Sequence, residues 1–187
     1  MPSPPRDSGP GLHHIWVNAT GNWPYFIDDL DRRRWLELLE RVAGDHSWVA
    51  PAFCQMTTHV HGIVDVPDTS LSRGMQYLSR EYSKRFNARH DRVGRFVRRR
   101  FGSRRITNGR DLLGTYAYVV LNPVREGMCP RAEDWRWSSY ATTLGLTDDF
   151  GFVDARMVIA ELGGSVDALR ALVAARAPQL AQTAMSR

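Results

Sequence analysis

Residues 55–66, QMTTHVHGIVDV, carry two histidines, His59 and His61, in an apolar run that alternates like a β-strand. Successive side chains of a strand point to opposite faces, so residues two apart share a face. The two imidazoles would stand side by side, in one row with Ile63 and Asp65, and the valines would point the other way. We expect the valine face to pack against helices and the histidine face to stay open. Such a pair suits one cation or one phosphate, although paired histidines also occur as ordinary surface residues.

The elements around this strand predict the fold. Strand patterns occupy residues 12–19, 47–56, 59–66 and 103–107, and apolar residues at helical spacing occupy residues 28–43, 71–87 and 111–122. Pro123 stops the last of these helices, because proline lacks a backbone N–H and disfavours helix at the residue before it. The order βαββαβα predicts an α+β fold of the ferredoxin-like kind: a βαββαβ antiparallel sheet followed by one further helix.

The length and composition indicate one globular domain. The 187 residues are enough for a single core, and 43% of them are hydrophobic. No apolar run approaches the roughly 18 residues of a membrane span, so we expect no membrane partner. Residues 1–10 are rich in Pro, Gly and Ser, lack the apolar stretch of a secretory signal, and are predicted to be a disordered leader. Two cysteines, Cys54 and Cys129, make neither a disulfide framework nor a zinc site, so a cytoplasmic setting is expected.

Positive charge is concentrated in one segment of the chain. The formal net charge is only +5, but residues 80–105 hold eleven Arg or Lys residues against two acids. Four aromatic residues are interleaved with these charges. Such a block is typical of proteins that bind a polyanion, most often nucleic acid; the alternative is a solvated surface. The residues predicted to bind DNA are Arg80, Lys84, Arg85, Arg95, Arg98, Arg99, Arg100, Arg104 and Arg105.

The predicted helix over residues 111–122 carries two tyrosines with different surroundings. At about 100° per residue, Tyr116 lies in the apolar stripe and is expected to pack in the core. Tyr118 falls well away from that stripe, on the same side as Asn122 one turn later. A tyrosine beside an amide on the polar side of a helix is well placed for chemistry, but it is also compatible with a plain surface position. The proximity to Asn122 requires that the last helical turn survive next to Pro123.

These motifs together resemble one family. HVHGIV (59–64), RRRFGSRR (98–105), YVVLNPVREG (118–127) and EDWRWSSY (133–140) occur in the order and spacing of single-tyrosine HUH transposases. The closest similarity is to the REP-associated tyrosine transposases of the insertion-sequence type, over residues 11–145. Residues 146–187 are then a helical C-terminal extension. The segment 133–140 itself is expected to be packed structure.

The resemblance implies a mechanism and a set of partners. In such proteins two histidines and a polar residue one turn after the tyrosine bind a divalent metal, Mg²⁺ or Mn²⁺; the matching positions are His59, His61 and Asn122. The matching nucleophile is Tyr118, which makes the third helix a catalytic helix and gives a 5′-phosphotyrosine intermediate. The implied substrate is single-stranded or hairpin DNA from repeated sequences. Joining two ends with one tyrosine requires sequential reactions or two protomers, so a monomer or a homodimer is expected.

Two departures from the family pattern and two competing functions stay open. Thr58 stands where the family usually has Asn, and ATGN (19–22) replaces an Arg-Gly pair. One alternative is a domesticated nucleic-acid-binding protein without cleavage activity. The other is a metal-dependent hydrolase that uses activated water, with Tyr118 as a bystander.

Overall fold

The computed structural model describes residues 9–21, 23–97 and 101–185, with side chains up to Pro178. Most of the predicted leader, residues 1–8, therefore lies outside the described residues. Four strands form one antiparallel sheet: β1 (Gly11–Asn18), β2 (Val49–Gln55), β3 (His59–Val66) and β4 (Gly102–Arg105). Their order across the sheet is β2-β3-β1-β4, and every neighbouring pair is antiparallel. With α1 and α2 in the connections, this confirms the predicted ferredoxin-like βαββαβ fold.

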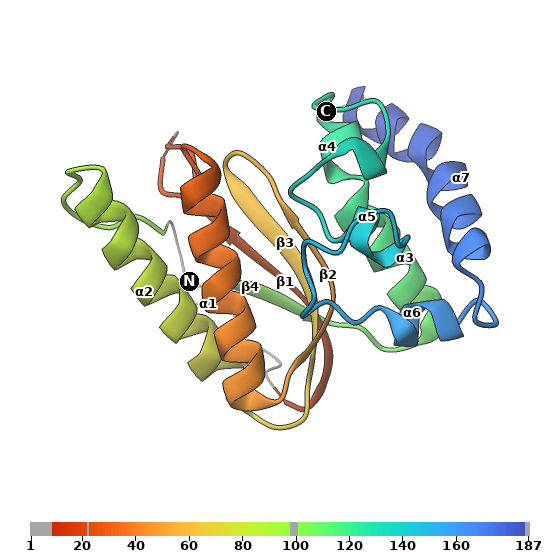
Figure 1. The fold of residues 1–187 in the computed structure, drawn as a ribbon, viewed down its shortest axis with the longest axis horizontal. Helices are drawn as coiled ribbons and strands as arrows, with labels where there is room; N and C mark the ends of the chain where they lie inside the picture. The colour runs from red at the N-terminus through yellow and green to blue at the C-terminus, as the bar shows by residue number, and fades with distance from the viewer. Residues whose placement is uncertain (1–8, 22, 98–100, 186–187) are drawn as a thin grey trace, which may run out of the picture.

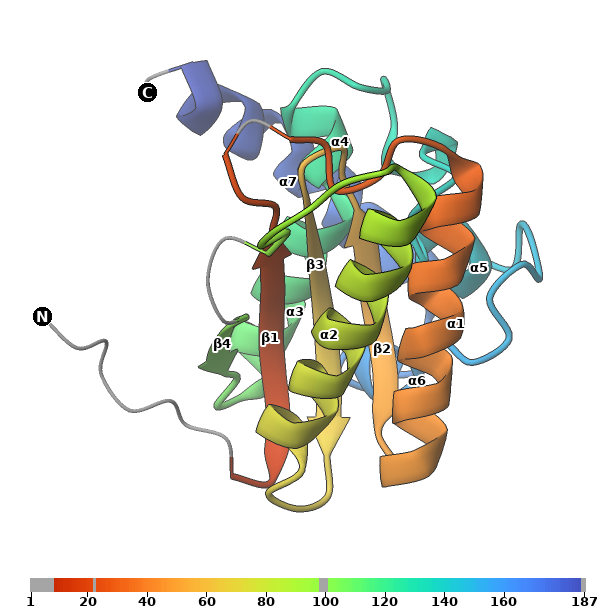
Figure 2. The same ribbon diagram turned by 90° about the vertical axis from the view of Figure 1, so that its left-hand side faces the viewer.

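Helices cover both faces of the sheet, which gives three layers (Figure 1). The first layer contains α1 (Asp29–His46) and α2 (Leu71–Arg89), which lie side by side in front of the sheet in Figure 2. The residues spaced along α2 at i, i+4, i+7, i+11 and i+15 are all buried: Leu71, Met75, Leu78, Tyr82 and Phe86. They form one core with the valine face of β3, as the alternation predicted.

The opposite face of the sheet carries the remaining helices (Figure 1). These are α3 (Gly109–Val120), α4 (Asn122–Arg125), the short 3₁₀ helix η1 (Ala132–Asp134), α5 (Tyr140–Thr143), α6 (Arg156–Ala160) and α7 (Val166–Met185). The expectation of an open histidine face is therefore wrong. The apolar stripe of α3 packs on Ala52, Cys54 and Ile63, and α6 and α7 close this second core from outside. When the apolar stripe of α3 packs on this face of the sheet, both apolar surfaces are removed from water. This is more favourable in free energy than leaving both exposed.

The outer edge of β2 is covered by the EDWRWSSY segment. Ser139 donates its N–H to the Phe53 carbonyl, and Gln55 donates its N–H to the Trp137 carbonyl. The Trp135 indole N–H donates to the Gln55 carbonyl at 3.0 Å. These bonds satisfy an otherwise open sheet edge, and they confirm that the segment is packed structure. Along the part of the chain that the structure describes, no helix is long and apolar enough to cross a bilayer.

Candidate active site

The two histidines of β3 lie on the sheet face beneath α3. In the strand register His61 stands between Trp16 of β1 and Cys54 of β2, and His59 stands opposite Asn18. The centroids of the two imidazole rings are 5.0 Å apart, with one ring edge facing the other. The shared face predicted from the spacing is thus confirmed, and β3 places both rings within reach of one small ligand.

Both imidazoles favour the neutral form. Burial lowers the pKa of His61 to about 2, and the neighbouring His14, His59 and Arg125 contribute to that lowering. Burial likewise lowers the pKa of His59. A neutral imidazole keeps one nitrogen with a free lone pair, which is the form that binds metals. The site therefore offers unprotonated histidine nitrogens across the neutral pH range.

Tyr118 approaches these histidines from α3. Its ring centroid lies 5.4 Å from that of His61, in an edge-to-face arrangement, and its side chain is half-buried. Tyr116, two residues earlier, is fully buried in the second core. The helical geometry assigned these two positions correctly. Because α3 lies over the histidine face, the turn that carries Tyr118 lies directly at the histidine pair.

Asn122 lies where α3 gives way to α4. Leu121 separates the two helices, so the last turn of α3 does not run straight through Asn122. The Asn122 Nδ2 donates to the Tyr118 carbonyl at 2.8 Å, and its Oδ1 accepts from the Arg125 guanidinium at 2.6 Å. The amide is thus bonded to the end of α3 and to Arg125. In this arrangement the structure does not direct it at the histidines, and its role as a third ligand stays a prediction.

Sequence reasoning gave no role to Arg125. Its guanidinium carbon lies 4.8 Å from the centroid of the Tyr118 ring, in a cation–π contact. Its positive charge also contributes to lowering the pKa of His59 and the pKa of His61. The only signal in the sequence was its place in the YVVLNPVREG motif. A fixed cation at this point attracts a DNA phosphate.

The histidine pair fits a divalent metal only with help from other donors. Among the described residues, no group of three or more His, Cys, Asp or Glu side chains is placed to hold an ion. The protein would supply the two neutral imidazoles, and further ligands would have to be an amide oxygen, water or the DNA phosphate. Nitrogen and oxygen donors of this kind suit Mn²⁺ and Mg²⁺.

The sheet divides the predicted DNA-binding residues into two groups. Arg80, Lys84 and Arg85 lie on α2, across the sheet from the histidines, whereas Arg104 pairs with His14 in the register of β4 and β1. Arg104 also forms a two-pronged ion pair with Asp111 of α3. The Arg105 guanidinium donates to the Pro10 carbonyl. Arg98, Arg99 and Arg100 lie outside the described residues.

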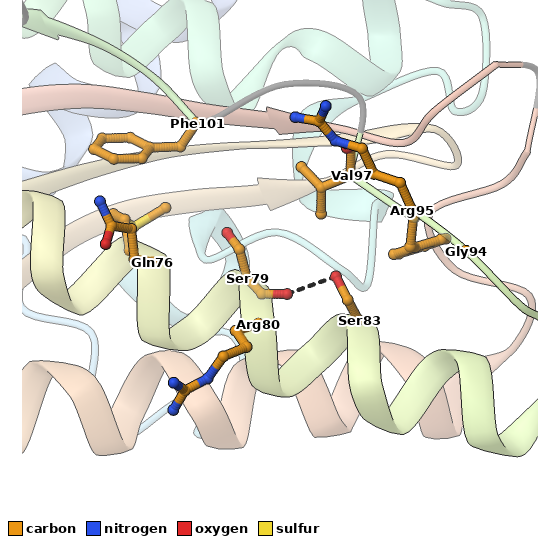
Figure 3. Close-up of a pocket in the computed structure, with 10 residues that line it drawn as sticks. Gln76, Ser79, Arg80, Ser83, Gly94, Arg95, Val97 and Phe101 are labelled. Atoms are coloured by element: carbon orange, nitrogen blue, oxygen red, sulfur yellow. Dashed lines mark hydrogen bonds between the residues drawn. The ribbon is translucent and has the colours of Figure 1, made fainter.

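A shallow pocket of about 290 Å³ lies between α2 and the segment before β4 (Figure 3). Two residues predicted to bind DNA, Arg80 and Arg95, line it from opposite sides. In Figure 3 the Arg80 guanidinium points away from the pocket, while the Ser79 hydroxyl points across it. Arg80 is ion-paired with Glu81, and the Arg95 Nε donates to the Val97 carbonyl at 2.9 Å.

A comparison with protein families agrees with this arrangement. A family model described as "Transposase IS200 like" matches residues 11–106, more than half of the chain. The matched range contains both histidines and the basic segment and ends before Tyr118. The chain belongs to the family of IS200-like transposases, which confirms the resemblance seen in the sequence. It is therefore a transposase, an enzyme that cleaves and rejoins DNA.

A comparison with solved structures supports the fold. The chain is similar to a solved structure described as "Structure of the REP associates tyrosine transposase bound to a REP hairpin". The identity is 19%, the TM-score is 0.65, and the match covers 83% of this chain and 90% of the other. At this identity the likeness establishes the fold alone. No curated protein matches the chain.

Proposed function

We propose that this transposase cuts and rejoins single-stranded DNA through a 5′-phosphotyrosine intermediate at Tyr118, with a divalent metal held by His59 and His61. The observation that carries the proposal is the contact between the Tyr118 and His61 rings, whose centroids are 5.4 Å apart. It brings the Tyr118 ring to one of the two neutral imidazoles from an element far away in the sequence, and His59 lies beside that imidazole. Such convergence is what covalent catalysis on a phosphodiester requires.

In the proposed reaction the Tyr118 oxygen attacks a phosphorus atom of the strand. An O–P bond forms to the tyrosine, the bond from phosphorus to the 3′ oxygen breaks, and the departing strand ends in a 3′-hydroxyl. The phosphotyrosine ester keeps the bond energy, so a 3′-hydroxyl reverses the step and rejoins DNA. A bound Mg²⁺ or Mn²⁺ supplies positive charge for the phosphate oxygens and for the leaving oxygen.

The other residues of the site position these groups. Arg125 packs its guanidinium on the Tyr118 ring and so restricts where the hydroxyl points. Asn122 joins Arg125 to the end of α3 through its two hydrogen bonds. We retain Asn122 as a candidate third ligand: its oxygen has a second lone pair besides the one that accepts from Arg125.

The proposed substrate is single-stranded DNA with a hairpin, from sequences repeated near the gene. The family and the basic segment support a polyanionic strand, since exposed arginines follow a phosphate backbone. The four aromatic residues interleaved with the basic ones, Tyr82, Phe86, Phe96 and Phe101, are buried in the core between the sheet and α1 and α2, so they do not offer stacking surfaces to bases. The similar solved structure is described as bound to a REP hairpin.

A covalent trapping experiment tests the proposal. Single-stranded oligonucleotides covering the genomic flanks, labelled at the 3′ end, are incubated with the protein and Mn²⁺ and run on a denaturing gel. The 3′ label should migrate with the protein, and a 5′ label should be released on a shorter strand. Tyr118→Phe should abolish the adduct, and Tyr116→Phe, the matched change two residues away, should keep it.

The competing functions give different results in the same experiment. Shortened strands without an adduct would indicate a hydrolase that uses water. Tight binding without shortened strands would indicate a domesticated binding protein. A nucleotide mapped by mass spectrometry to Tyr116, or an adduct that survives in Tyr118→Phe, would overturn the assignment of the nucleophile.

A further inference from the structure

A third histidine, His14 of β1, contacts the pair on β3. Its Nε2 lies 3.0 Å from the Nδ1 of His61, and both side chains are more than nine-tenths buried. The two rings are stacked, with centroids 5.1 Å apart. The β1–β3 register pairs His14 with Ile63, so His14 sits diagonally from His61 on the same face. Diagonal neighbours across antiparallel strands are within reach of ring side chains.

A hydrogen bond between two neutral imidazoles restricts where their protons lie. One nitrogen must donate and the other accept, so the bond couples the tautomers of the two rings. If His61 binds a metal through Nε2, that nitrogen must be bare and the ring proton must sit on Nδ1. His14 Nε2 is then the acceptor of that proton.

We infer that His14 is a positioning residue, which accepts a hydrogen bond from His61 Nδ1 and so holds the His61 Nε2 free for the metal. The inference rests on the proposed function and goes beyond it, because it assigns the orientation of one ligand to a residue outside the HxH motif. Residues that bind the second nitrogen of a metal-ligating histidine fix the tautomer and the ring angle.

His59 has a parallel arrangement. The Thr58 hydroxyl lies 3.1 Å from the Nδ1 of His59. In the described part of the chain, no hydrogen bond engages the Nε2 atom of His59 or of His61. Each histidine thus has its Nδ1 bonded to a polar neighbour and its Nε2 without a hydrogen bond, which is the arrangement that two Nε2 ligands need.

A substitution that tests His14 must preserve its packing. Its ring also contacts Trp16, with centroids 5.2 Å apart, and Tyr118, with centroids 5.8 Å apart. His14→Phe keeps an aromatic ring but removes the acceptor. His14→Gln returns an acceptor at a similar distance from the backbone. His13→Gln is the control, because His13 lies on the other face of β1 and bonds the Gly9 carbonyl instead.

The first measurement is of the His61 tautomer and needs neither metal nor DNA. In ¹⁵N-labelled, metal-free protein at pH 7, long-range ¹H–¹⁵N correlations distinguish a protonated Nδ1 from a protonated Nε2. We expect the proton of His61 on Nδ1 in the wild type and in His13→Gln. We expect it to move to Nε2 in His14→Phe. A wild-type His61 with a bare Nδ1 would overturn the inference.

The second measurement is of Mn²⁺ affinity, followed by the loss of the free-ion electron paramagnetic resonance signal. Removal of such an orienting partner typically weakens binding by about 10–100-fold. We expect that weakening in His14→Phe, partial recovery in His14→Gln, and unchanged affinity of all variants for single-stranded DNA in chelator. Equal Mn²⁺ affinity in His14→Phe and the wild type would overturn the role inferred for His14 and leave the proposed function standing. A wild type that binds no Mn²⁺ would instead overturn the proposed function, and the role of His14 with it.

Discussion

At the scale of single residues, two tyrosines two positions apart have opposite surroundings because a helix turns about 200° between them. Tyr116 is fully buried in the second core, whereas Tyr118 is half-buried and meets His61. The same reasoning succeeded on β3, where period-two alternation placed both histidines on one face. Helical and strand periods were therefore enough to place both histidines on one face and Tyr118 apart from the buried stripe, while the roles proposed for these residues came from the resemblance to a family. These periods were not enough to find Arg125 or His14, whose contacts cross between elements.

The histidine pair gives a direct prediction for activity. His59→Ala and His61→Ala should each lower the cleavage rate by about a hundredfold or more, since several kcal/mol of charge stabilisation is removed. Binding of uncut single-stranded DNA should persist. EDTA should stop the wild-type reaction, and Mg²⁺ or Mn²⁺ should restore it.

The measurement is the initial rate of strand cleavage beside a filter-binding assay. His46→Ala, at the end of α1 in the other helix layer, is the control and should cleave normally. Full activity of the wild type in chelator would show that no metal takes part.

At the scale of elements, α1 and α2 are joined by charged side chains at the ends of the helices. Asp28 caps α1 by accepting from the N–H groups of Leu30 and Asp31. Arg89, in the last turn of α2, pairs with both Asp28 and Asp31. The sequence indicated acids suited to the helix dipole. The arginine that meets them lies some sixty residues along the chain, and only the packing of α1 on α2 brings it there.

This junction predicts a dependence of stability on pH. The hydrogen bond from Arg89 holds the pKa of Asp28 well below its usual range. Near pH 4 and below, the unfolded chain therefore binds a proton that the folded protein does not. The free energy of unfolding should fall as the pH drops through the ordinary aspartate range, about 3.9, toward the lower folded value. Asp28→Asn keeps a good helix cap and should make this fall shallower.

Urea unfolding at pH 6 and at pH 3.5 measures the effect as a difference between the two pH values. Arg89→Gln should reduce that difference as Asp28→Asn does, and the double variant should add little further, because the two residues act as one pair. A full wild-type pH dependence in Asp28→Asn would contradict the assignment.

At the scale of the whole molecule, the sheet stands between two sets of basic residues. The arginines and the lysine of α2 lie on one side, and Arg104 lies with the histidines and Tyr118 on the other. A block that is continuous in sequence is therefore not one surface in the fold. Residues 94–97 and Phe101 adjoin α2 near the β4 edge, so a bound strand that passes around this edge would meet both sets.

The basic segment gives a prediction for the salt dependence of binding. Changing Arg98, Arg99 and Arg100 together to Gln should weaken binding of single-stranded DNA. For each DNA phosphate that the variant no longer neutralises, the slope of log K against log salt should become shallower by about 0.7, since fewer counterions are released. Fluorescence anisotropy at several salt concentrations measures the slope.

The control removes the same charge elsewhere. Changing Arg131, Arg156 and Arg170 to Gln should leave the slope almost unchanged, because these exposed residues lie outside the predicted interface. Equal slopes in the wild type and in the Arg98–Arg100 variant would show that those three arginines do not neutralise DNA phosphates.

The sequence by itself determined the order of elements, the strand that carries the HxH pair, and the buried apolar stripe of α3. Each of these follows from short-range periods, and each is confirmed by the strand register, by burial or by the sheet order. Only the tertiary structure decided that α3 covers the histidine face, that His14 bonds His61, that Arg125 packs on Tyr118, and that the Asn122 amide is bonded to the end of α3. These contacts depend on the register between strands and on how one layer packs on another. Both are set by burying apolar surface across the whole domain, a sum over distant residues that no local pattern in the chain contains.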